Sequence, residues 1–231
     1  MHVIKNNVKG ECECYVNIAG DFKRPTRELI VEYAKLSTPT IDESFNRRGA
    51  MDPTIQTIKN GLKLCGPAFT VKCHVGDNLT LIKAIDLAQK GDVLVVDIGN
   101  VCDSSPWGEI TTTACVEKGI MGLVINASVR DIAILRKIEF PVFSKGVCIK
   151  GTTKNYFGFI NYPICCGGII VNPGDIVVGD DDGVVVVNLG EAEDTLKKAY
   201  ERDKKEEELI MQLKQGKSLW DIAGFKQKYE Y

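Results

Sequence analysis

Three charged residues in the stretch from Gly91 to Asp131 are of the types that bind small acids and metal ions. Glu109 follows a loop rich in Gly, Asn, Ser and Pro, and the pair Arg130-Asp131 comes after twenty further residues. Two carboxylates beside a guanidinium suit a carboxylate-bearing substrate next to a hard divalent cation, because Mg²⁺ and Mn²⁺ prefer carboxylate and water oxygens. The chain has only 2 histidines, which disfavours a histidine-based zinc site.

Two short apolar segments are predicted to position these residues. Residues 93–96 and 121–125 are too short for helices and rich in β-branched side chains, and each precedes a polar loop and a segment of helical character. They predict two consecutive βα units. If the strands are parallel neighbours, both loops open at the same edge of the sheet, where α/β folds place their ligands. Backbone N–H groups at the helix start near Glu109 can then bind a substrate carboxylate.

An alternative interpretation of Arg130-Asp131 is purely structural. An aspartate near a helix start complements the helix dipole, and the arginine can form a surface ion pair. The Arg-Asp pair alone favours that structural interpretation. A functional site becomes the better interpretation when Glu109, one helix and one strand upstream, is considered together with the pair.

Helices and strands are also expected outside these two units. The expected elements are a helix over 25–36 with Thr26 as its N-cap, a helix start at 37–45, a strand over 66–75, a helix from Thr80 stopped by Gly91, a helical segment over 132–138, an extended segment over 141–149, short strands over 162–188, and a closing helix capped by Ser218. The change from βα alternation to clustered strands predicts a mixed sheet or a second sheet packed on the first. Residues 191–216 predict a long charged helix whose thin apolar stripe is typical of a helix that packs on a partner subunit or lies over the sheet.

Length and composition indicate one folded domain. The chain has 231 residues, of which 44% are hydrophobic and 26% charged, and we expect a single α/β domain over residues 21–231 after an N-terminal arm over residues 1–20. A formal net charge of −2 without a Lys/Arg stripe argues against a nucleic-acid partner. No apolar run approaches the roughly 20 residues that span a membrane, and no signal-peptide core is evident, so a cytoplasmic location is expected.

The 9 cysteines predict neither a disulfide framework nor a zinc ribbon. Their number is odd and no C-x-x-C pair occurs, although Cys12 and Cys14 form C-x-C and Cys165 and Cys166 are adjacent. Most others lie in or beside apolar segments, where a reduced thiol behaves as a small hydrophobe. We therefore expect reduced, structural cysteines.

The spacing of the charged residues resembles a known family motif. Trp107-Gly108-Glu109 followed after twenty residues by Arg130-Asp131 matches the Asp/Glu-x20-Arg-Asp motif of the class II pyruvate aldolases. These 4-hydroxy-4-methyl-2-oxoglutarate aldolases also decarboxylate oxaloacetate, and they share a family with the regulators of ribonuclease E activity. The resemblance spans roughly residues 40–215 and includes further matches at 66–68, 76–78, 91–97, 173–175 and 179–187.

The resemblance implies a fold, an assembly and a reaction. The fold would be an α/β, mixed-sheet ββα swivelling (phosphohistidine-like) sandwich with a long C-terminal helix. The assembly would be a homotrimer, or a homohexamer of two trimers, with active sites at subunit interfaces. The reaction would be cleavage of 4-hydroxy-4-methyl-2-oxoglutarate-type 2-oxo acids, or decarboxylation of oxaloacetate, to pyruvate by a divalent-metal-dependent lyase through a metal-stabilised enolate, with Mg²⁺ or Mn²⁺ as the cofactor.

The resemblance also implies a role for each site residue. Asp131 would ligate the metal directly, and Glu109 would hold its waters or approach the ion itself. Arg130 would bind the pyruvyl oxygen, and the amides of Gly108, Ile110 and Thr111 would receive the substrate carboxylate. A glutamate from a neighbouring subunit would lie near the site, for which residues 206–208 are candidates, although a solvated charged face is favoured there.

The chain departs from the family motif at one place. Before Arg130 the family often shows Asp-Gly, whereas this chain has Asn126-Ala127-Ser128, which bears on the pocket for the aldol acceptor.

Two other functions are alternatives to the lyase. The first is a non-catalytic regulator that binds a ribonuclease or another protein. Glu109 argues against it, because a pure binder does not need the complete acid–Arg–Asp set. A methyltransferase is the weakest alternative, because no glycine-rich strand–loop–helix start with a downstream ribose-binding acid is evident.

Overall fold

Four parallel strands form the centre of the molecule. The computed structural model describes residues 2–6 and 14–229. The strands lie side by side in chain order and are β4 (Leu64–Lys72), β5 (Val93–Asp97), β6 (Gly122–Val129) and β7 (Val142–Val147). The strands of the two predicted βα units are therefore parallel neighbours, which is the condition for their loops to open at one edge of the sheet. Because β5 and β6 are buried along their whole length, they read as continuous apolar runs rather than as alternating patterns.

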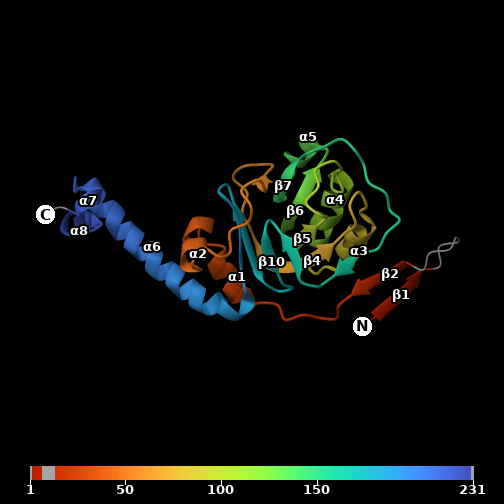
Figure 1. Cartoon of the computed structure of the whole chain (residues 1–231), viewed down its shortest axis with the longest axis horizontal. Coiled ribbons are helices and arrows are strands. Elements are labelled where there is room, and N and C mark those ends of the chain that lie inside the picture. The colour runs from red at the N-terminus through yellow and green to blue at the C-terminus, as the bar shows by residue number, and fades with distance from the viewer. Residues whose placement is uncertain (1, 7–13, 230–231) are drawn as a thin grey trace.

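The two faces of the central sheet contribute to different cores. Leu94 and Val96 of β5 pack with the helices α3 (Leu79–Leu87) and α4 (Glu109–Lys118), whereas Val93 and Val95 pack with the strands of the opposite layer. Successive side chains of a strand point to opposite faces, which explains this division. The third connecting helix, α5 (Ile132–Leu135), follows β6 and lies on the same side as α4 (Figure 1).

Antiparallel strands complete the sheet and make it mixed, as predicted. The hairpin of β11 and β12 pairs with the first half of β4, and two short strands form a separate sheet that packs over β5. The remaining strands outside the N-terminus are β3 (Gln56–Thr57), β8 (Phe159–Ile160), β9 (Ile164–Cys166), β10 (Ile169–Val171), β11 (Ile176–Asp180) and β12 (Gly183–Val187). With the N-terminal strands β1 (His2–Asn6) and β2 (Cys14–Ile18), the path through the large sheet is β1-β2-β8-β4-β5-β6-β7-β3, and the β11–β12 hairpin is a branch.

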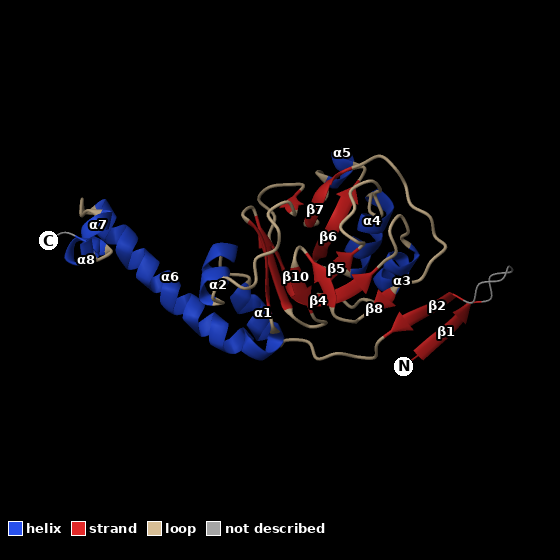
Figure 2. Cartoon of the chain, viewed as in Figure 1, coloured by secondary structure: helices blue, strands red, loops and turns tan. Residues whose placement is uncertain are grey.

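A second group of helices packs on the β11–β12 hairpin. It comprises α1 (Arg27–Tyr33), α2 (Thr38–Ser44) and the first half of α6 (Ala192–Lys214), which is preceded by a short 3₁₀ turn (Leu189–Glu191). The predicted N-cap at Thr26 is confirmed, because its hydroxyl accepts from the N–H of Leu29 at 3.3 Å. The predicted cap at Ser218 is confirmed at the start of α7 (Leu219–Ile222), which α8 (Phe225–Tyr229) follows. Figure 2 shows α6 continuing well beyond the body of the molecule.

Three elements differ from the sequence-based expectation. The N-terminal residues contain two paired strands, β1 (His2–Asn6) and β2 (Cys14–Ile18), where only an arm or turn was predicted. Helix α3 ends at Leu87, before Gly91, because Asp92 accepts a hydrogen bond from the N–H of Gln89 and holds the turn out of the helix. The segment after Asp131 forms only one helical turn rather than a longer helix. The division of the chain at residue 20 stays a prediction.

The described cysteines include four that are buried in the cores. None of the seven whose side chains are described is part of a disulfide, and burial raises the pKa of the Cys65, Cys73 and Cys115 thiols to about 12. Burial also raises the pKa of Cys166. Cys12 lies outside the described residues. Within the described part of the chain no helix has the length and apolarity needed to cross a membrane.

Packing at the centre of β6 predicts a large loss of stability on truncation. Leu123 is fully buried between Leu94 and Val142 of the neighbouring strands, so Leu123→Ala should lower the free energy of unfolding by about 2–5 kcal/mol. Urea unfolding measures this change. The control Ile170→Ala, at a side chain that is 71% exposed, should change the free energy by less than about 0.5 kcal/mol. A loss below about 1 kcal/mol for Leu123→Ala would contradict the packing described.

Candidate active site

Trp107 fixes the position at which α4 begins. Its indole is buried, lies 6.1 Å from the Phe140 ring in a stacked arrangement, and donates from Nε1 to Oγ1 of Thr112 at 2.7 Å. Its carbonyl accepts from the N–H of Arg130 at 3.0 Å, which pairs it with the end of β6. The loop after β5 therefore returns to β6 just before α4 starts. This return brings the two predicted loops together.

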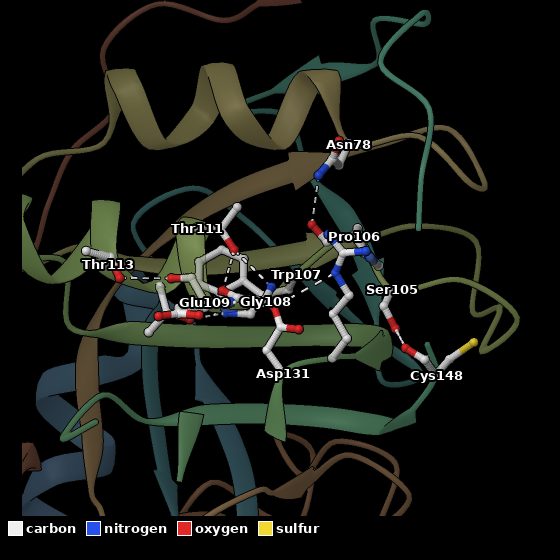
Figure 3. A network of polar contacts seen from close by, with 12 residues as sticks. Asn78, Ser105, Pro106, Trp107, Gly108, Glu109, Thr111, Thr113, Asp131 and Cys148 are labelled. Carbon is white, nitrogen blue, oxygen red and sulfur yellow. Dashed lines mark hydrogen bonds and ion pairs between the residues drawn. The ribbon is translucent and has the colours of Figure 1, made fainter. Parts of the chain in front are cut away.

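The carboxylate of Asp131 lies at the N-terminus of α4. Its Oδ2 accepts a hydrogen bond from the backbone N–H of Glu109 at 3.0 Å (Figure 3). Nε of Arg130 lies 3.9 Å from the same oxygen, and the side chains of Arg130 and Asp131 are 46% and 40% exposed. An ion pair with this length and exposure contributes little to stability. The three charged residues predicted from the sequence thus lie together and remain accessible.

Gly108 makes the approach of Asp131 possible. A Cβ at this position would lie 2.3 Å from Oδ2 of Asp131, which is far too close for a real contact, and a tight 3.1 Å from Cγ of Arg130. The backbone of Gly108 is extended, with φ −168°, so the requirement for glycine comes from space and not from strain. Any larger residue here would displace the Asp131 carboxylate.

The first turn of α4 leaves two backbone donors for a ligand. The N–H of Gly108 already donates to Oγ1 of Thr111 at 3.0 Å, and the N–H of Glu109 donates to Asp131. Among the described residues, none accepts from the N–H of Ile110 or Thr111. Free N–H groups at the start of a helix attract anions, because the helix dipole adds to their own partial charge. An anionic group can therefore bind here without a side-chain partner.

These groups line a cavity of about 530 Å³. Its polar and charged lining residues include Asn78, Ser105, Lys118, Thr152 and Lys154, together with Glu109, Arg130 and Asp131. Helix α3 contributes Ile82 to the lining and helix α4 contributes Ile110, which is 84% exposed. A space of this size accommodates a small dicarboxylic acid and a hydrated ion.

Asn78 is a lining residue that the sequence did not single out. It is buried, and its Nδ2 donates to the carbonyl of Pro106 at 2.9 Å, whereas no described residue donates to its Oδ1. A buried amide oxygen without a partner is costly unless a ligand or water supplies a donor. The turn Gly76-Asp77-Asn78 was the only sequence signal for it, because only the fold brings this turn against the loop before α4.

Asp77 holds the loop over residues 153–156 against the cavity. Its Oδ2 accepts from the hydroxyl of Thr153 at 2.7 Å and from the N–H of Asn155 at 2.6 Å, and its Oδ1 accepts from the N–H of Leu79 at 2.8 Å. Burial alone would raise the pKa of Asp77, but these hydrogen bonds outweigh it and hold the pKa below its ordinary value. The carboxylate form is therefore the one that stabilises this loop.

Comparisons with known proteins show which family the chain resembles over most of its length. A family model described as "RraA-like: Aldolase/RraA" matches residues 38–186. A protein of Halalkalibacterium halodurans named "Putative 4-hydroxy-4-methyl-2-oxoglutarate aldolase" is 34% identical over 180 residues, which covers 78% of this chain and 86% of that protein.

The chain belongs to the RraA-like aldolase family.

Solved structures of RraA-like proteins and their neighbours share the fold. An uncharacterized protein from Pseudomonas syringae superposes with a TM-score of 0.79 at 26% identity, covering 88% of this chain and 96% of that one. RraAS2 of Streptomyces coelicolor, described as an unusual member of the RNase ES inhibitor RraA protein family, superposes with a TM-score of 0.74 at 26% identity, covering 83% and 100%. The expected RraA-like architecture, an α/β fold with a mixed sheet and a long C-terminal helix, is confirmed.

The departure from the family motif at residues 126–128 lies beneath the site rather than in it. Asn126 is buried, accepts from the N–H of Ile98 at 2.9 Å and donates to Oδ1 of Asp97 at 2.8 Å. Ser128 is also buried and donates to the carbonyl of Cys102 at 2.9 Å. Both side chains thus tie the loop after β5 to the sheet, and neither lines the cavity. The departure at residues 126–128 therefore leaves the lining of the cavity unchanged.

The donor set suits a hard cation that keeps most of its water. No group of three or more His, Cys, Asp or Glu side chains gathers within the described part of the chain in a way that could hold a metal. Asp131 instead offers one accessible carboxylate, whose Oδ1 accepts no hydrogen bond from any described residue. Glu109, the residue that directly follows Gly108, is also exposed. Mg²⁺ is commonly bound through one or two carboxylates with waters in the other positions, so these residues fit it.

The contacts of Asp77 predict a pH-dependent effect on stability. Because its pKa lies below the ordinary value of 3.8, the stabilisation is present above that pH and is lost as the pH falls through the lower, folded-state value. At pH 7, Asp77→Asn should lower the free energy of unfolding by about 1–3 kcal/mol, and the deficit should shrink below pH 4.

Thermal unfolding of both proteins between pH 7 and pH 3 measures this difference. Asp21→Asn, at a side chain that is 94% exposed, serves as the control and should be neutral within about 0.5 kcal/mol. An equal deficit at pH 7 and pH 3 would show that the charge of Asp77 does not hold the loop.

Proposed function

We propose that the chain is a divalent-metal-dependent carbon–carbon lyase that releases pyruvate from a 2-oxo acid. Its substrates would be 4-hydroxy-4-methyl-2-oxoglutarate-type acids, oxaloacetate, or both. The observation that carries the proposal is the carboxylate of Asp131, held 3.0 Å from the first amide of α4 beside Arg130 and open to a cavity. Membership of the aldolase family and the name of the H. halodurans relative support this choice of reaction.

The substrate would be anchored at two points. Its carboxylate would receive the N–H groups of Ile110 and Thr111, since that of Gly108 is already bonded to Thr111. The guanidinium of Arg130 would bind the neighbouring 2-oxo oxygen, with Asn78 at the side of the cavity as a further polar contact. Two fixed points orient the bond to be broken toward the open part of the cavity. Orientation of this kind removes much of the entropic barrier.

Negative charge develops on the pyruvyl fragment when the bond breaks. Retro-aldol cleavage and β-decarboxylation both leave an electron pair that delocalises onto the 2-oxo oxygen as an enolate. The positive charge of Arg130, bound to that oxygen, would stabilise the enolate more than it stabilises the neutral ketone. The residues that would hold Mg²⁺ or Mn²⁺ are Asp131 directly and Glu109 through water. When bound, the ion would add Lewis acidity at the same oxygen.

A homotrimer or homohexamer with sites at subunit interfaces belongs to the same proposal. Ile110 lines the cavity yet is 84% exposed, and Ile149, beyond β7, is 91% exposed. Apolar side chains this exposed next to a polar site are typical of a surface that another subunit covers. A cytoplasmic location remains a prediction.

Pyruvate release tests the proposal directly. The protein should release pyruvate from oxaloacetate or from 4-hydroxy-4-methyl-2-oxoglutarate with Mg²⁺ or Mn²⁺, and EDTA should abolish the release. Asp131→Ala should lower the metal-dependent rate by about 100-fold or more, because loss of outer-shell partners alone commonly reduces metal affinity or activity 10–100-fold. The size of the oligomer should not change, since Asp131 is exposed and makes no packing contact in the core.

Glu117→Gln is the matched control for this variant. It removes another exposed carboxylate from α4, one that does not line the cavity, and should leave the rate unchanged. Turnover of neither substrate under any metal condition would contradict the lyase proposal and favour the non-catalytic regulator. Full activity of Asp131→Ala would remove Asp131 from the proposed metal site.

A further inference from the structure

The helices α3 and α4 are joined to each other by hydrogen bonds near both of their ends. At their starts, Nδ2 of Asn78, the N-cap of α3, donates to the carbonyl of Pro106 at 2.9 Å, just before α4 begins (Figure 3). At their ends, Nζ of Lys118 donates to the carbonyls of Ile85 and Asp86 at 2.9 and 2.5 Å. The two helices therefore run in the same direction, with the candidate active site at their common N-terminal end.

Apolar side chains line the space between these two bonded ends. Ile82 and Ile85 come from α3, and Ile110 and Ala114 come from α4, at spacings of three and four residues that keep one face of each helix. Ile82 is 40% exposed and Ile110 is 84% exposed, whereas Ile85 is buried. Ala114 is also exposed, and its single methyl group leaves room that a larger side chain would fill. We refer to the space lined by these four residues as the α3–α4 groove.

The α3–α4 groove is continuous with the candidate active site. One cavity of about 530 Å³ is lined by Arg130 and Asp131 at the start of α4 and by Lys118 and Asp86 at the far end. Lys118 lies eight residues after Ile110, which corresponds to about 12 Å of helix. Clefts of about 300–1,000 Å³ enclose ligands of drug size. The cavity therefore extends well beyond the space that a pyruvyl group at the start of α4 would fill.

The charged residues at the far end of the groove are already paired. Nζ of Lys118 is bonded to two carbonyls of α3, and Oδ2 of Asp86 accepts from Nζ of Lys83 at 2.7 Å. Neither residue requires an ion from the ligand. An ionic group in the apolar part of the groove would lose its hydration without gaining a partner. An uncharged, apolar group matches this space.

We propose that the α3–α4 groove binds an apolar substituent on C4 of the substrate, so that the preferred substrates are 4-hydroxy-2-oxoglutarates with an alkyl chain on that carbon. The inference rests on the proposed lyase function. With the pyruvyl part held by Arg130 and by the first amides of α4, C4 points into the cavity. The alkyl chain then lies along Ile82 and Ala114 and ends before Lys118.

The reaction on such a substrate is a retro-aldol cleavage. The bond between C3 and C4 breaks, and its electron pair passes to the pyruvyl fragment as the enolate. The C4 hydroxyl loses its proton and becomes the carbonyl of the second product, and a proton added to C3 gives the methyl group of pyruvate. A pentyl chain on C4 therefore leaves as part of 2-oxoheptanoate. The step needs no oxidant, reductant or further reactant.

The ratio of kcat/KM for two substrates tests the groove. 4-Hydroxy-4-methyl-2-oxoglutarate and its 4-pentyl analogue differ by four methylene groups, and full burial of each would raise affinity about fourfold. Because the groove is partly open, we expect kcat/KM for the pentyl acid to be higher by about tenfold or more. The gain should appear in KM and not in kcat, since the chain makes the same contacts in the ground state and the transition state.

Ala114→Leu fills the groove and should bring the ratio of the two kcat/KM values to within about twofold of one. Val116→Leu is the matched control. It enlarges another apolar residue of α4 that is 42% exposed but does not line the cavity, and it should leave the ratio unchanged. Circular dichroism should show the native helix content in both variants.

Cleavage of the methyl acid without a preference for the pentyl acid would overturn the inference and leave the lyase proposal intact. An Ala114→Leu variant that keeps the native ratio would also overturn it, and a change in its molar mass alone would show that a second subunit fills the groove instead. If neither acid is cleaved, the lyase proposal fails, and calorimetric titration with both acids decides the groove separately. Equal affinities would then overturn the groove, whereas tighter binding of the pentyl acid that Ala114→Leu abolishes would retain it as the site for the chain.

Discussion

The hydrogen bond from the backbone N–H of Glu109 to the carboxylate of Asp131 is the contact on which the site depends. It joins the start of α4 to the residue that follows β6, two points separated by one helix and one strand in the chain. Asp131 reaches it in a left-handed conformation, with φ 60°, which aspartate tolerates better than most residues. The absence of a side chain at Gly108 leaves the space for it.

The exposed groups of the site rest on buried and fully bonded neighbours. Trp107 is fixed by Phe140 and Thr112, the Asp77 carboxylate binds the loop over residues 153–156, and Asn126 joins the ends of β5 and β6. Accessible functional groups on a fixed support are what an efficient binding or catalytic site requires.

Much of this arrangement was predictable from local patterns in the sequence. The β-branched runs before Glu109 and before Arg130 predicted the strands of two βα units, and such strands place the loops that follow them at one edge when they pair in parallel. Contacts between distant segments were not predictable in this way. Asn78 enters the cavity because its turn meets Pro106, and the role of Asn126 under the loop became clear only from its bonds to Asp97 and Ile98. The strands β1 and β2 carry no alternation that would distinguish them from a surface arm.

The most direct test of this account is the catalytic efficiency of Gly108→Ala. The added methyl group would lie 2.3 Å from Oδ2 of Asp131, so the carboxylate must move by roughly 1 Å to relieve the contact. A displacement of that size can cost about 100-fold in rate, and we expect kcat/KM for pyruvate release to fall by about that factor with little change in the free energy of unfolding. A variant that keeps kcat/KM within about twofold of the native protein would contradict the claim that the Glu109–Asp131 contact sets the geometry of the site.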